Sequence, residues 1–296
     1  MYKTFAEVKT ALASGSTVLE IVEGYLNAIQ QNSDLNAFLE VFGNSAKEKA
    51  IEVDAKRKAG NAGRLAGMVI GLKDNLCYAG HKVSASSKIL EGFESLFTGT
   101  AVQRLLDEDA IIIGRLNCDE FAMGSSNENS AFGPVKNFLN KNLVPGGSSG
   151  GSAVAVSAGL CTATLGSDTG GSIRQPASFT GTYGLKPTYG RISRYGLIAY
   201  ASSFDQIGPF TNSLEDSALL LEIMAGEDEF DSTVSSRPVD AYSSIEGIQP
   251  KRIAVIQESL HTEGIDPEVV AKMEDMIAKL KADGHEVEFV SFPYLE

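Results

Sequence analysis

The chain has 296 residues, 43% of them hydrophobic, and a formal net charge of −13. This length permits a large buried core in one large or two ordinary domains, and the apolar runs are far shorter than a membrane span. The negative charge disfavours direct binding of nucleic acid phosphates, and the first residues carry no apolar signal region, so we expect a globular protein that is not secreted.

The three cysteines are Cys77, Cys118 and Cys161, and they form no Cys-x-x-Cys pair. An odd number of unclustered cysteines indicates free thiols in a reducing compartment, so we expect a cytoplasmic protein. The segment Thr169–Phe204 is locally basic because it contains cations but no acidic residue. Either these cations serve a site or they pair with acids elsewhere in the chain, and the second interpretation is favoured. The cations are Arg174, Lys186, Arg191 and Arg194.

Three helices are predicted near the N-terminus. Thr4-x-x-Glu7 and Thr17-x-x-Glu20 both fit capping boxes that precede a helical pattern. A charged, alanine-rich helix is predicted over Asn44–Gly60, where the glycine ends it. We expect residues 1–62 to form a helical layer without chemistry and residues 63–296 to form the core, both within one domain.

Strands and helices alternate along the rest of the chain. This alternation predicts an α/β fold in which helices cover a parallel or mixed sheet. The predicted elements are a strand in Met68–Asn75, a helix over Thr100–Asp107, a strand over Ala110–Gly114, a short helix over Asn117–Met123, a helix over Leu214–Ala225, a strand over Arg252–Ile256, a helix over Pro267–Asp283 and a strand over His285–Val290.

Two loops rich in glycine and serine, Pro145–Ser152 and Gly166–Arg174, dominate the middle of the chain. The segment between them is small and apolar, which a flexible linker would not be. It predicts a buried helix that opens at Ser152, followed by a short buried strand over Cys161–Gly166. Both loops are therefore expected to be fixed to the core, where they can form a site.

Two kinds of chemistry fit these loops poorly. Neither loop contains the lysine of a phosphate-binding Walker loop or a Gly-x-Gly-x-x-Gly fingerprint. Gly146–Gly150 satisfies the Gly-x-Ser-x-Gly pattern of Ser-His-Asp hydrolases, but Pro145 stands where that motif needs a strand. None of the three histidines lies in a motif typical of a site, so structural or surface roles are favoured for all of them: His81, His261 and His285.

A serine nucleophile activated by lysine remains. Lysine acts as a base only when it is neutral, and burial lowers its pKa by up to about 3–5 units. Lys73 is the best candidate because it ends the apolar run Val69–Leu72. An equally good interpretation is a lysine at the end of a strand that reaches solvent or pairs with Asp74.

The glycines before Ser172 add an independent argument. Gly170 and Gly171 allow backbone N–H groups to point at one spot, as an oxyanion hole requires. Ser172 would attack a carbonyl whose oxygen lies among the amides of residues 169–172. Ser148, in the other loop, could relay the proton from Ser172 to Lys73.

These residues resemble the amidase signature family. The resemblance rests on Pro145–Ser152, on Gly166–Ala177, on the lysine motif Gly71–Asn75 and on the spacing of 24 residues between Ser148 and Ser172. Other segments are similar to one branch of the family, the glutamine-hydrolysing A subunits of tRNA-dependent amidotransferases. The resemblance covers nearly the whole chain. The segments are Asn117–Gly124, Lys186–Leu197 and Ala201–Pro209.

The resemblance implies a Ser–cis-Ser–Lys triad. Ser172 would be the nucleophile that forms an acyl-ester, Ser148 the bridging serine at a cis peptide bond, and Lys73 the neutral base. It also implies an oxyanion hole and a substrate-binding segment: Thr169, Gly170 and Gly171 for the first, Met123 and Gly124 for the second.

The resemblance further implies a heterotrimer in which this chain hydrolyses glutamine. The B and C subunits would be its partners, and the B subunit would bind tRNA and use ATP and Mg²⁺ to convert Glu-tRNA(Gln) to Gln-tRNA(Gln) or Asp-tRNA(Asn) to Asn-tRNA(Asn). The chain itself would hold no cofactor or metal. The alternatives are a free-standing amidase of the same family and an inactive, truncated structural partner.

The family's catalytic domain is considerably longer than this chain. We therefore expect residues 63–296 to be the catalytic core, incomplete at its C-terminus. The charged residues that grip the α-amino and α-carboxylate groups of the substrate would lie beyond Glu296.

Overall fold

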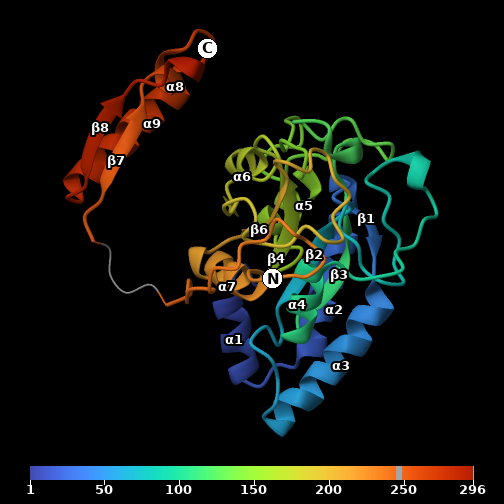
Figure 1. Ribbon diagram of the computed structural model, residues 1–296. Helices are drawn as coiled ribbons and strands as arrows, with labels where there is room; N and C mark the ends of the chain where they lie inside the picture. The colour runs from blue at the N-terminus through green and yellow to red at the C-terminus, as the bar shows by residue number, and fades with distance from the viewer. Residues whose placement is uncertain (245–248, 296) are drawn as a thin grey trace. The chain divides into compact units, whose positions relative to one another are not determined.

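The computed structural model describes residues 1–244 and 249–295, and the chain separates into two compact units, Met1–Ser243 and Ser244–Glu296 (Figure 1). The N-terminal helices share one hydrophobic core with the sheet of the first unit. Residues 1–62 and the sheet therefore lie in the same compact unit. In the part of the chain that the structure describes, no helix is both long and apolar enough to cross a membrane.

A mixed sheet of six strands, in the order β1-β3-β2-β4-β6-β5, forms the centre of the first unit. The central strand β2 runs parallel to both β3 and β4, whereas β1 and β6 are antiparallel to their neighbours β3 and β4. The expectation of a mixed sheet is confirmed. The strands are β1 (Phe38–Val41), β2 (Val69–Lys73), β3 (Ile111–Leu116), β4 (Ala163–Asp168), β5 (Tyr183–Gly184) and β6 (Gln206–Thr211).

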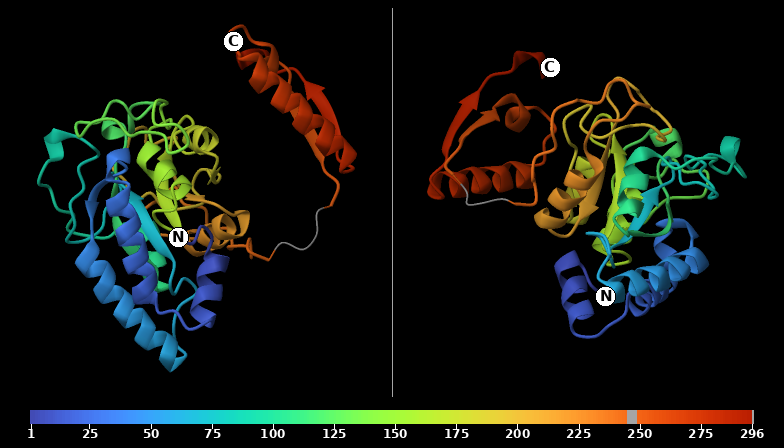
Figure 2. Two further views of the ribbon diagram at one scale, coloured as in Figure 1. Left: turned by 180° about the vertical axis from the view of Figure 1, so that it is seen from behind. Right: turned by 60° about the horizontal axis from the view of Figure 1, so that its bottom comes forward.

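Helices cover the sheet, as the views in Figure 2 show. Both predicted capping boxes are present, with Glu7 and Glu20 reaching back to the first residue of each box. The third helix ends at Gly60, whose φ of 75° is left-handed and favours glycine. The helices are α1 (Phe5–Ala13), α2 (Val18–Gln31), α3 (Gly43–Ala59), α4 (Thr100–Asp107), α5 (Gly150–Ser157), α6 (Arg174–Thr180) and α7 (Leu214–Met224).

The second unit is a strand-helix-strand arrangement, as the sequence predicts. Strands β7 (Arg252–Ile256) and β8 (Glu286–Val290) run parallel, and α9 (Pro267–Ala282) connects them after the short α8 (Glu258–His261). Asp266 caps α9, with its side chain accepting the N–H of Glu268.

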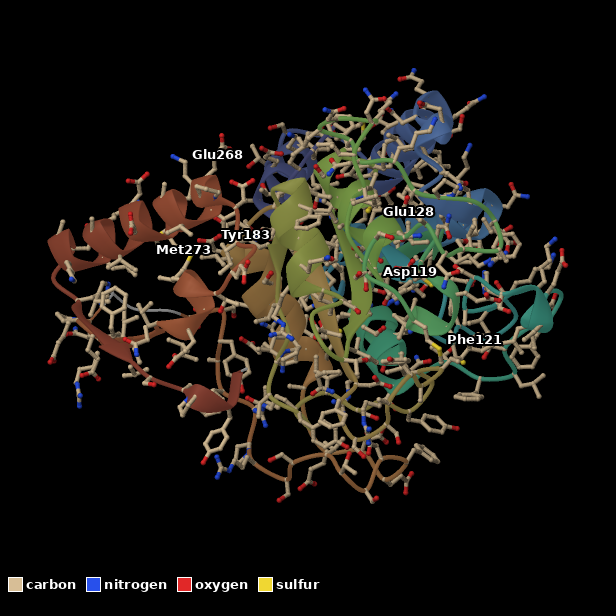
Figure 3. All side chains as sticks on the ribbon, turned by 90° about the horizontal axis from the view of Figure 1, so that it is seen from above. Asp119, Phe121, Glu128, Tyr183, Glu268 and Met273 are labelled. Carbon is tan, nitrogen blue, oxygen red and sulfur yellow. The ribbon has the colours of Figure 1, made fainter. Side chains whose placement is uncertain are left out.

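The segment after β3 differs from its prediction. Instead of a helix over Asn117–Met123, the chain forms a single 3-10 turn over Glu120–Ala122, in which Phe121 has a left-handed φ of 51° (Figure 3). The Phe121 N–H donates to the carbonyl of Ala85, a residue from a distant loop. A tertiary hydrogen bond therefore replaces the local helical one, which sequence periodicity does not reveal.

The helix between the two glycine-rich loops begins two residues earlier than predicted, at Gly150. The next residue, Gly151, packs against backbone, because a Cβ placed there would lie 2.4 Å from the Asn117 carbonyl oxygen and 2.8 Å from that of Ala37. The glycines of the first loop thus serve two purposes. They shape the turn, and they allow α5 to pack directly on the chain that follows β3.

We expect Gly151→Ala to destabilise the fold by about 1–3 kcal/mol, as overpacking in a dense core typically does. The intrinsic gain of up to about 1 kcal/mol from replacing a helical glycine with alanine is too small to offset this clash. Urea unfolding measures the difference. Gly43→Ala is the matched control, because its Cβ would meet only Leu26, at 3.9 Å, and its stability should stay equal or rise. Equal stability of the two variants would contradict the packing argument.

Candidate active site

Lys73 ends β2 with its whole side chain buried. Its Nζ lies 2.7 Å from Ser148 Oγ and 2.9 Å from Ser149 Oγ. A third hydroxyl, Ser167 Oγ at the end of β4, is also 2.9 Å away. Asp74 does not pair with Lys73, because its carboxylate accepts from Arg115, 2.9 Å away. The sequence left open whether Lys73 is buried or whether it reaches solvent or pairs with Asp74. In the structure it is buried.

The pKa of Lys73 suits a base. Burial disfavours the ammonium form and lowers the pKa of Lys73 to about 8, although Asp119, Asp168 and Asp205 act in the opposite direction. The oxygens around Nζ are three neutral hydroxyls and, at 3.5 Å, the carbonyl of Ser167, and none of them stabilises the charge as a carboxylate would. With this pKa, about one tenth of Lys73 is neutral at pH 7 and about half at pH 8.

Ser148 and Ser149 are both fully buried at the N-terminal end of α5. The peptide bond between Gly147 and Ser148 is cis. The hydroxyl of Ser149 donates to the carbonyl of Ser167, 3.1 Å away, and its N–H donates to the carbonyl of Ser172, 3.2 Å away. The two glycine-rich loops are therefore joined directly. Among the described residues, no hydrogen bond joins the side chains of Ser148 and Ser172.

Asp168 anchors the loop that carries Ser172. Its fully buried carboxylate accepts the N–H of Gly171 at 2.9 Å and that of Ile173 at 3.0 Å, and it forms an ion pair with Arg174. Burial alone would raise the pKa of Asp168, but the hydrogen bonds from Arg174 and Ile173 outweigh burial and hold this pKa below its ordinary value. A permanently ionised side chain thus fixes the backbone on both sides of Ser172.

The amides expected to form an oxyanion hole are not equivalent. The N–H of Gly171 is engaged by Asp168. The N–H groups of Thr169, Gly170 and Ser172 have no acceptor among the residues that the structure describes. The hydroxyl of Thr169 donates to Asp205 at 2.5 Å. Thr169, Gly170 and Ser172 therefore keep a backbone N–H available for a substrate oxygen, whereas Gly171 does not.

The half-buried Ser172 lies in a pocket of about 260 Å³. Gly124 and the three expected oxyanion residues line this pocket, whereas Met123 is not among the lining residues and its side chain is 53% exposed. Three further residues line the pocket that were not predicted as site residues. They lie outside the two glycine-serine loops or carry amide and hydroxyl groups, which are common throughout a protein. They are Ser125, Gln175 and Tyr200.

The remaining basic residues of Thr169–Phe204 form ion pairs or hydrogen bonds with other residues of the same chain. Arg194 pairs with Asp231, and Arg191 donates to the carbonyls of Arg237 and Pro238. Lys186 donates to the carbonyl of Pro187. Together with the pair formed by Arg174, these contacts favour the interpretation that the basic stretch is satisfied internally.

None of the histidine side chains that the structure describes lines the Ser172 pocket. His81 stacks on Tyr78 at a ring distance of 4.1 Å, and the Nδ1 of His285 accepts the N–H of Lys251 in the second unit. The side chain of His261 lies outside the described part of the chain. The three cysteines are buried free thiols.

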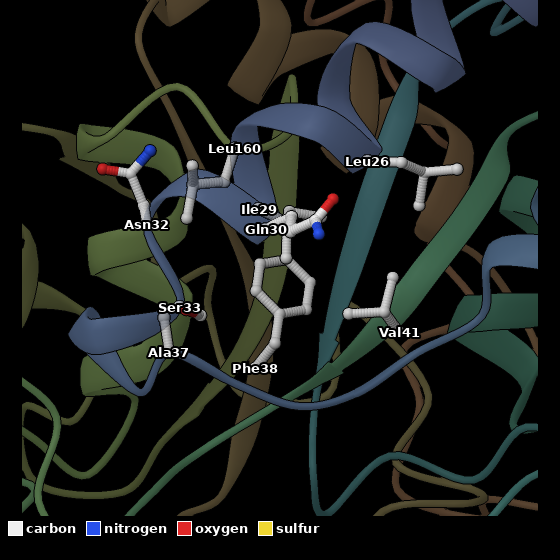
Figure 4. A pocket seen from close by; sticks show the side chains of 9 residues that line it. All are labelled: Leu26, Ile29, Gln30, Asn32, Ser33, Ala37, Phe38, Val41 and Leu160. Carbon is white, nitrogen blue, oxygen red and sulfur yellow. The ribbon is translucent and has the colours of Figure 1, made fainter.

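A second pocket, of about 320 Å³, lies between α2 and β1 (Figure 4). None of its nine lining residues is ionisable, and Leu26, Ile29, Phe38 and Val41 make it largely apolar. It therefore lacks a base, and no ionisable group lines it to activate its one hydroxyl, that of Ser33.

Comparison with known proteins identifies the family. The family model described as Amidase matches residues 20–296, which is most of the chain. The chain belongs to the amidase family.

Curated relatives are similar along the whole chain. It is 50% identical to the A subunit of glutamyl-tRNA(Gln) amidotransferase from Salinibacter ruber over 301 aligned positions, which cover 100% of this chain and 58% of the relative. It is 46% identical to the same protein of Chlorobium phaeobacteroides, with 99% of this chain and 62% of the relative covered. The chain therefore spans about three-fifths of the length of these relatives.

Solved structures of the family share the fold. The A subunit of the Thermotoga maritima glutamyl-tRNA(Gln) amidotransferase is 39% identical with a TM-score of 0.82, covering 95% of this chain and 62% of that one. The native peptide amidase of Stenotrophomonas maltophilia is 33% identical with a TM-score of 0.85, covering 95% and 60%. The amidase-signature fold is thus shared by amidotransferase subunits and by enzymes that are named as amidases alone.

Proposed function

We propose that this chain is the glutamine-hydrolysing subunit of a tRNA-dependent amidotransferase and that Ser172, Ser148 and Lys73 form its triad. The observation that carries the proposal is the buried contact of 2.7 Å between Lys73 Nζ and Ser148 Oγ. A lysine with a pKa of about 8 is a competent base near neutral pH, and a hydroxyl beside it can relay a proton.

The hydrogen count at Lys73 permits this direction of proton transfer. A neutral amine has two hydrogens and one lone pair. Ser149 commits its own hydrogen to the Ser167 carbonyl and therefore accepts one from Lys73. If Ser167 Oγ accepts the second hydrogen, the lone pair of Lys73 faces Ser148.

In the proposed reaction, Ser172 Oγ attacks the side-chain carbonyl of glutamine. Its proton passes to Ser148, whose own proton passes to Lys73. The N–H groups of Thr169, Gly170 and Ser172 would stabilise the oxyanion, and one such donor is typically worth about 2.7–4 kcal/mol. The proton returns through Ser148 to the leaving nitrogen, ammonia departs, and water then hydrolyses the acyl-ester by the same route.

The wider assignment rests on the relatives. Those 46–50% identical are named as the A subunit of an amidotransferase. We propose the B and C subunits of such an enzyme as partners, with tRNA, ATP and Mg²⁺ bound by the B subunit and ammonia as the product passed to it. The chain's charge of −13 fits a protein that does not itself hold tRNA.

A free-standing amidase is the second candidate, because a peptide amidase shares the fold with a TM-score of 0.85. The network of Lys73, Ser148 and Ser149 is intact, which argues against the third candidate, an inactive structural partner.

Co-expression with the B and C subunits separates the first two candidates. We expect the chain to co-elute with the B and C subunits as a stable complex that releases ammonia from glutamine. Ammonia release and co-elution are measured together. A chain that stays unbound and hydrolyses simple amides as fast as glutamine would favour the free-standing amidase.

A further inference from the structure

The side chain of Gln175, the second residue of α6, connects two walls of the Ser172 pocket. Its Oε1 accepts the N–H of Gly147 at 2.9 Å, and its Nε2 donates to the carbonyl of Ser125 at 2.9 Å. Gly147 precedes the buried Ser148, and Ser125 lines the pocket. One amide therefore joins the pocket wall to the turn that carries the serine beside Lys73.

The glycines of this turn are enclosed on two sides. A Cβ at Gly146 would lie 2.6 Å from Gln175 Oε1, and a Cβ at Gly147 would lie 2.1 Å from Asp119 Oδ2. Gly146 also has a left-handed φ of 81°. The turn is thus held between Gln175 and Asp119, with no space for a side chain at either glycine.

Asp119 forms the fixed side of this arrangement. Its buried carboxylate accepts the N–H groups of Asn127 and Asn129 at 3.0 and 3.2 Å, and its own N–H donates to the Ser148 carbonyl at 3.1 Å. Removing that carboxylate would leave the N–H of the buried Asn127 without its acceptor. Gln175 holds the opposite side through its side chain alone.

We propose that Gln175 is a positioning residue that holds Ser148 against Lys73 through the Gly147 N–H and holds the pocket wall through the Ser125 carbonyl. The inference rests on the proposed function, because it takes Ser148 as the proton relay. Both the oxygen and the nitrogen of the Gln175 amide bind backbone groups, so the residue acts through Gly147 and Ser125.

Two substitutions separate these contacts. Gln175→Met removes both, whereas Gln175→Glu keeps an acceptor for the Gly147 N–H and, once ionised, has no donor for Ser125. Ser178→Ala is the matched control, because Ser178 is exposed on the same helix. Each full chain is reacted at pH 8 with a small fluorophosphonate that labels nucleophilic serines, and glutamine kinetics are measured in the complex with the B and C subunits.

We expect Gln175→Met to label Ser172 between about tenfold and 100-fold more slowly than wild type, as small misplacements of reacting groups do. Gln175→Glu should label within about threefold of wild type, since one neutral hydrogen bond is of modest net worth, but should raise KM for glutamine. Wild-type labelling in Gln175→Met, or equally slow labelling in both variants, would overturn the inference.

Hydrogen exchange at the Gly147 amide tests the same contact without activity. We expect faster exchange in Gln175→Met and wild-type protection in Gln175→Glu and Ser178→Ala. Equal protection in all variants would overturn the positioning role. A further outcome separates failure of this inference from failure of the proposed function. If the variants show these exchange rates but the wild-type chain is not labelled at Ser172, the proposed function fails and the contact between Gln175 and Gly147 stands.

Discussion

Ser172→Ala is expected to reduce ammonia release from glutamine by roughly 10⁴-fold or more, the order of loss seen when a catalytic nucleophile is removed from a triad. The physical reason is that no neighbouring group can replace the attacking oxygen. Ser148 and Ser149 are fully buried, whereas Ser172 lies in the pocket. Ammonia release by the complex and fluorophosphonate labelling of the chain both measure the effect.

The control for this experiment is Ser178→Ala on the exposed side of α6, which should hydrolyse glutamine as wild type does. The structure of the Ser172→Ala variant should be retained, because the hydroxyl of Ser172 makes no hydrogen bond among the described residues. Unchanged ammonia release in Ser172→Ala would remove Ser172 as the nucleophile and the triad with it.

Lys73→Met is expected to abolish acylation of Ser172 and also to change how the reaction depends on pH. With a pKa of about 8, Lys73 loses its proton as pH rises through that value. The labelling rate of wild type should therefore rise with pH and reach half of its maximum near pH 8. Lys73→Met removes the titrating base, so its residual rate should be low and should lack this step. Retained labelling with a wild-type pH profile would exclude Lys73 from the mechanism.

The same lysine predicts a trend in stability. Its pKa in the folded chain, about 8, is lower than the ordinary value of 10.5, so between these two pH values the unfolded chain binds more protons than the folded one. The free energy of unfolding contributed by Lys73 therefore increases from pH 8 to pH 10.5, as the cost of burying the ammonium disappears. Burial raises the pKa values of Cys118, Cys161 and Tyr25, so these groups lower the stability of both proteins over the same range. The difference in free energy of unfolding between wild type and Lys73→Met isolates Lys73, and denaturant unfolding should show this difference increasing from pH 8 to pH 10.5.

Regular elements with strong local signals were predictable. The capping boxes at Thr4 and Thr17 fixed the first two helices, and the apolar run before Lys73 located β2. Local hydrogen bonds and continuous burial leave a pattern in a few neighbouring residues. The elements that were not predicted, including β1, β6 and α6, are short or lie among turn residues, and their partners are distant in the chain.

In the candidate site, too, local features were predictable and contacts between distant segments were not. The types of its residues were visible in the sequence, because a serine, flanking glycines and a lysine after an apolar run are chemically distinctive. Gln175 and Asp119 lie in segments that carry the family resemblance, but neither was given a role, since the sequence does not show which groups their side chains contact. Both residues matter because they contact Gly147. Gln175 lies 28 residues from Gly147 in the sequence, so this contact leaves no local pattern.

By itself, the sequence determined the α/β class, the N-terminal helices and the residue types available for acyl transfer, because these depend on local patterns of burial, capping and glycine. It left Lys73 equally divided between a solvent-exposed strand end and a buried base. Only the tertiary structure decided that question, by placing the hydroxyls of Ser148, Ser149 and Ser167 around its amine. The desolvation that lowers the pKa of a lysine depends on every group packed around it, and those groups come from β2, β4 and α5 together.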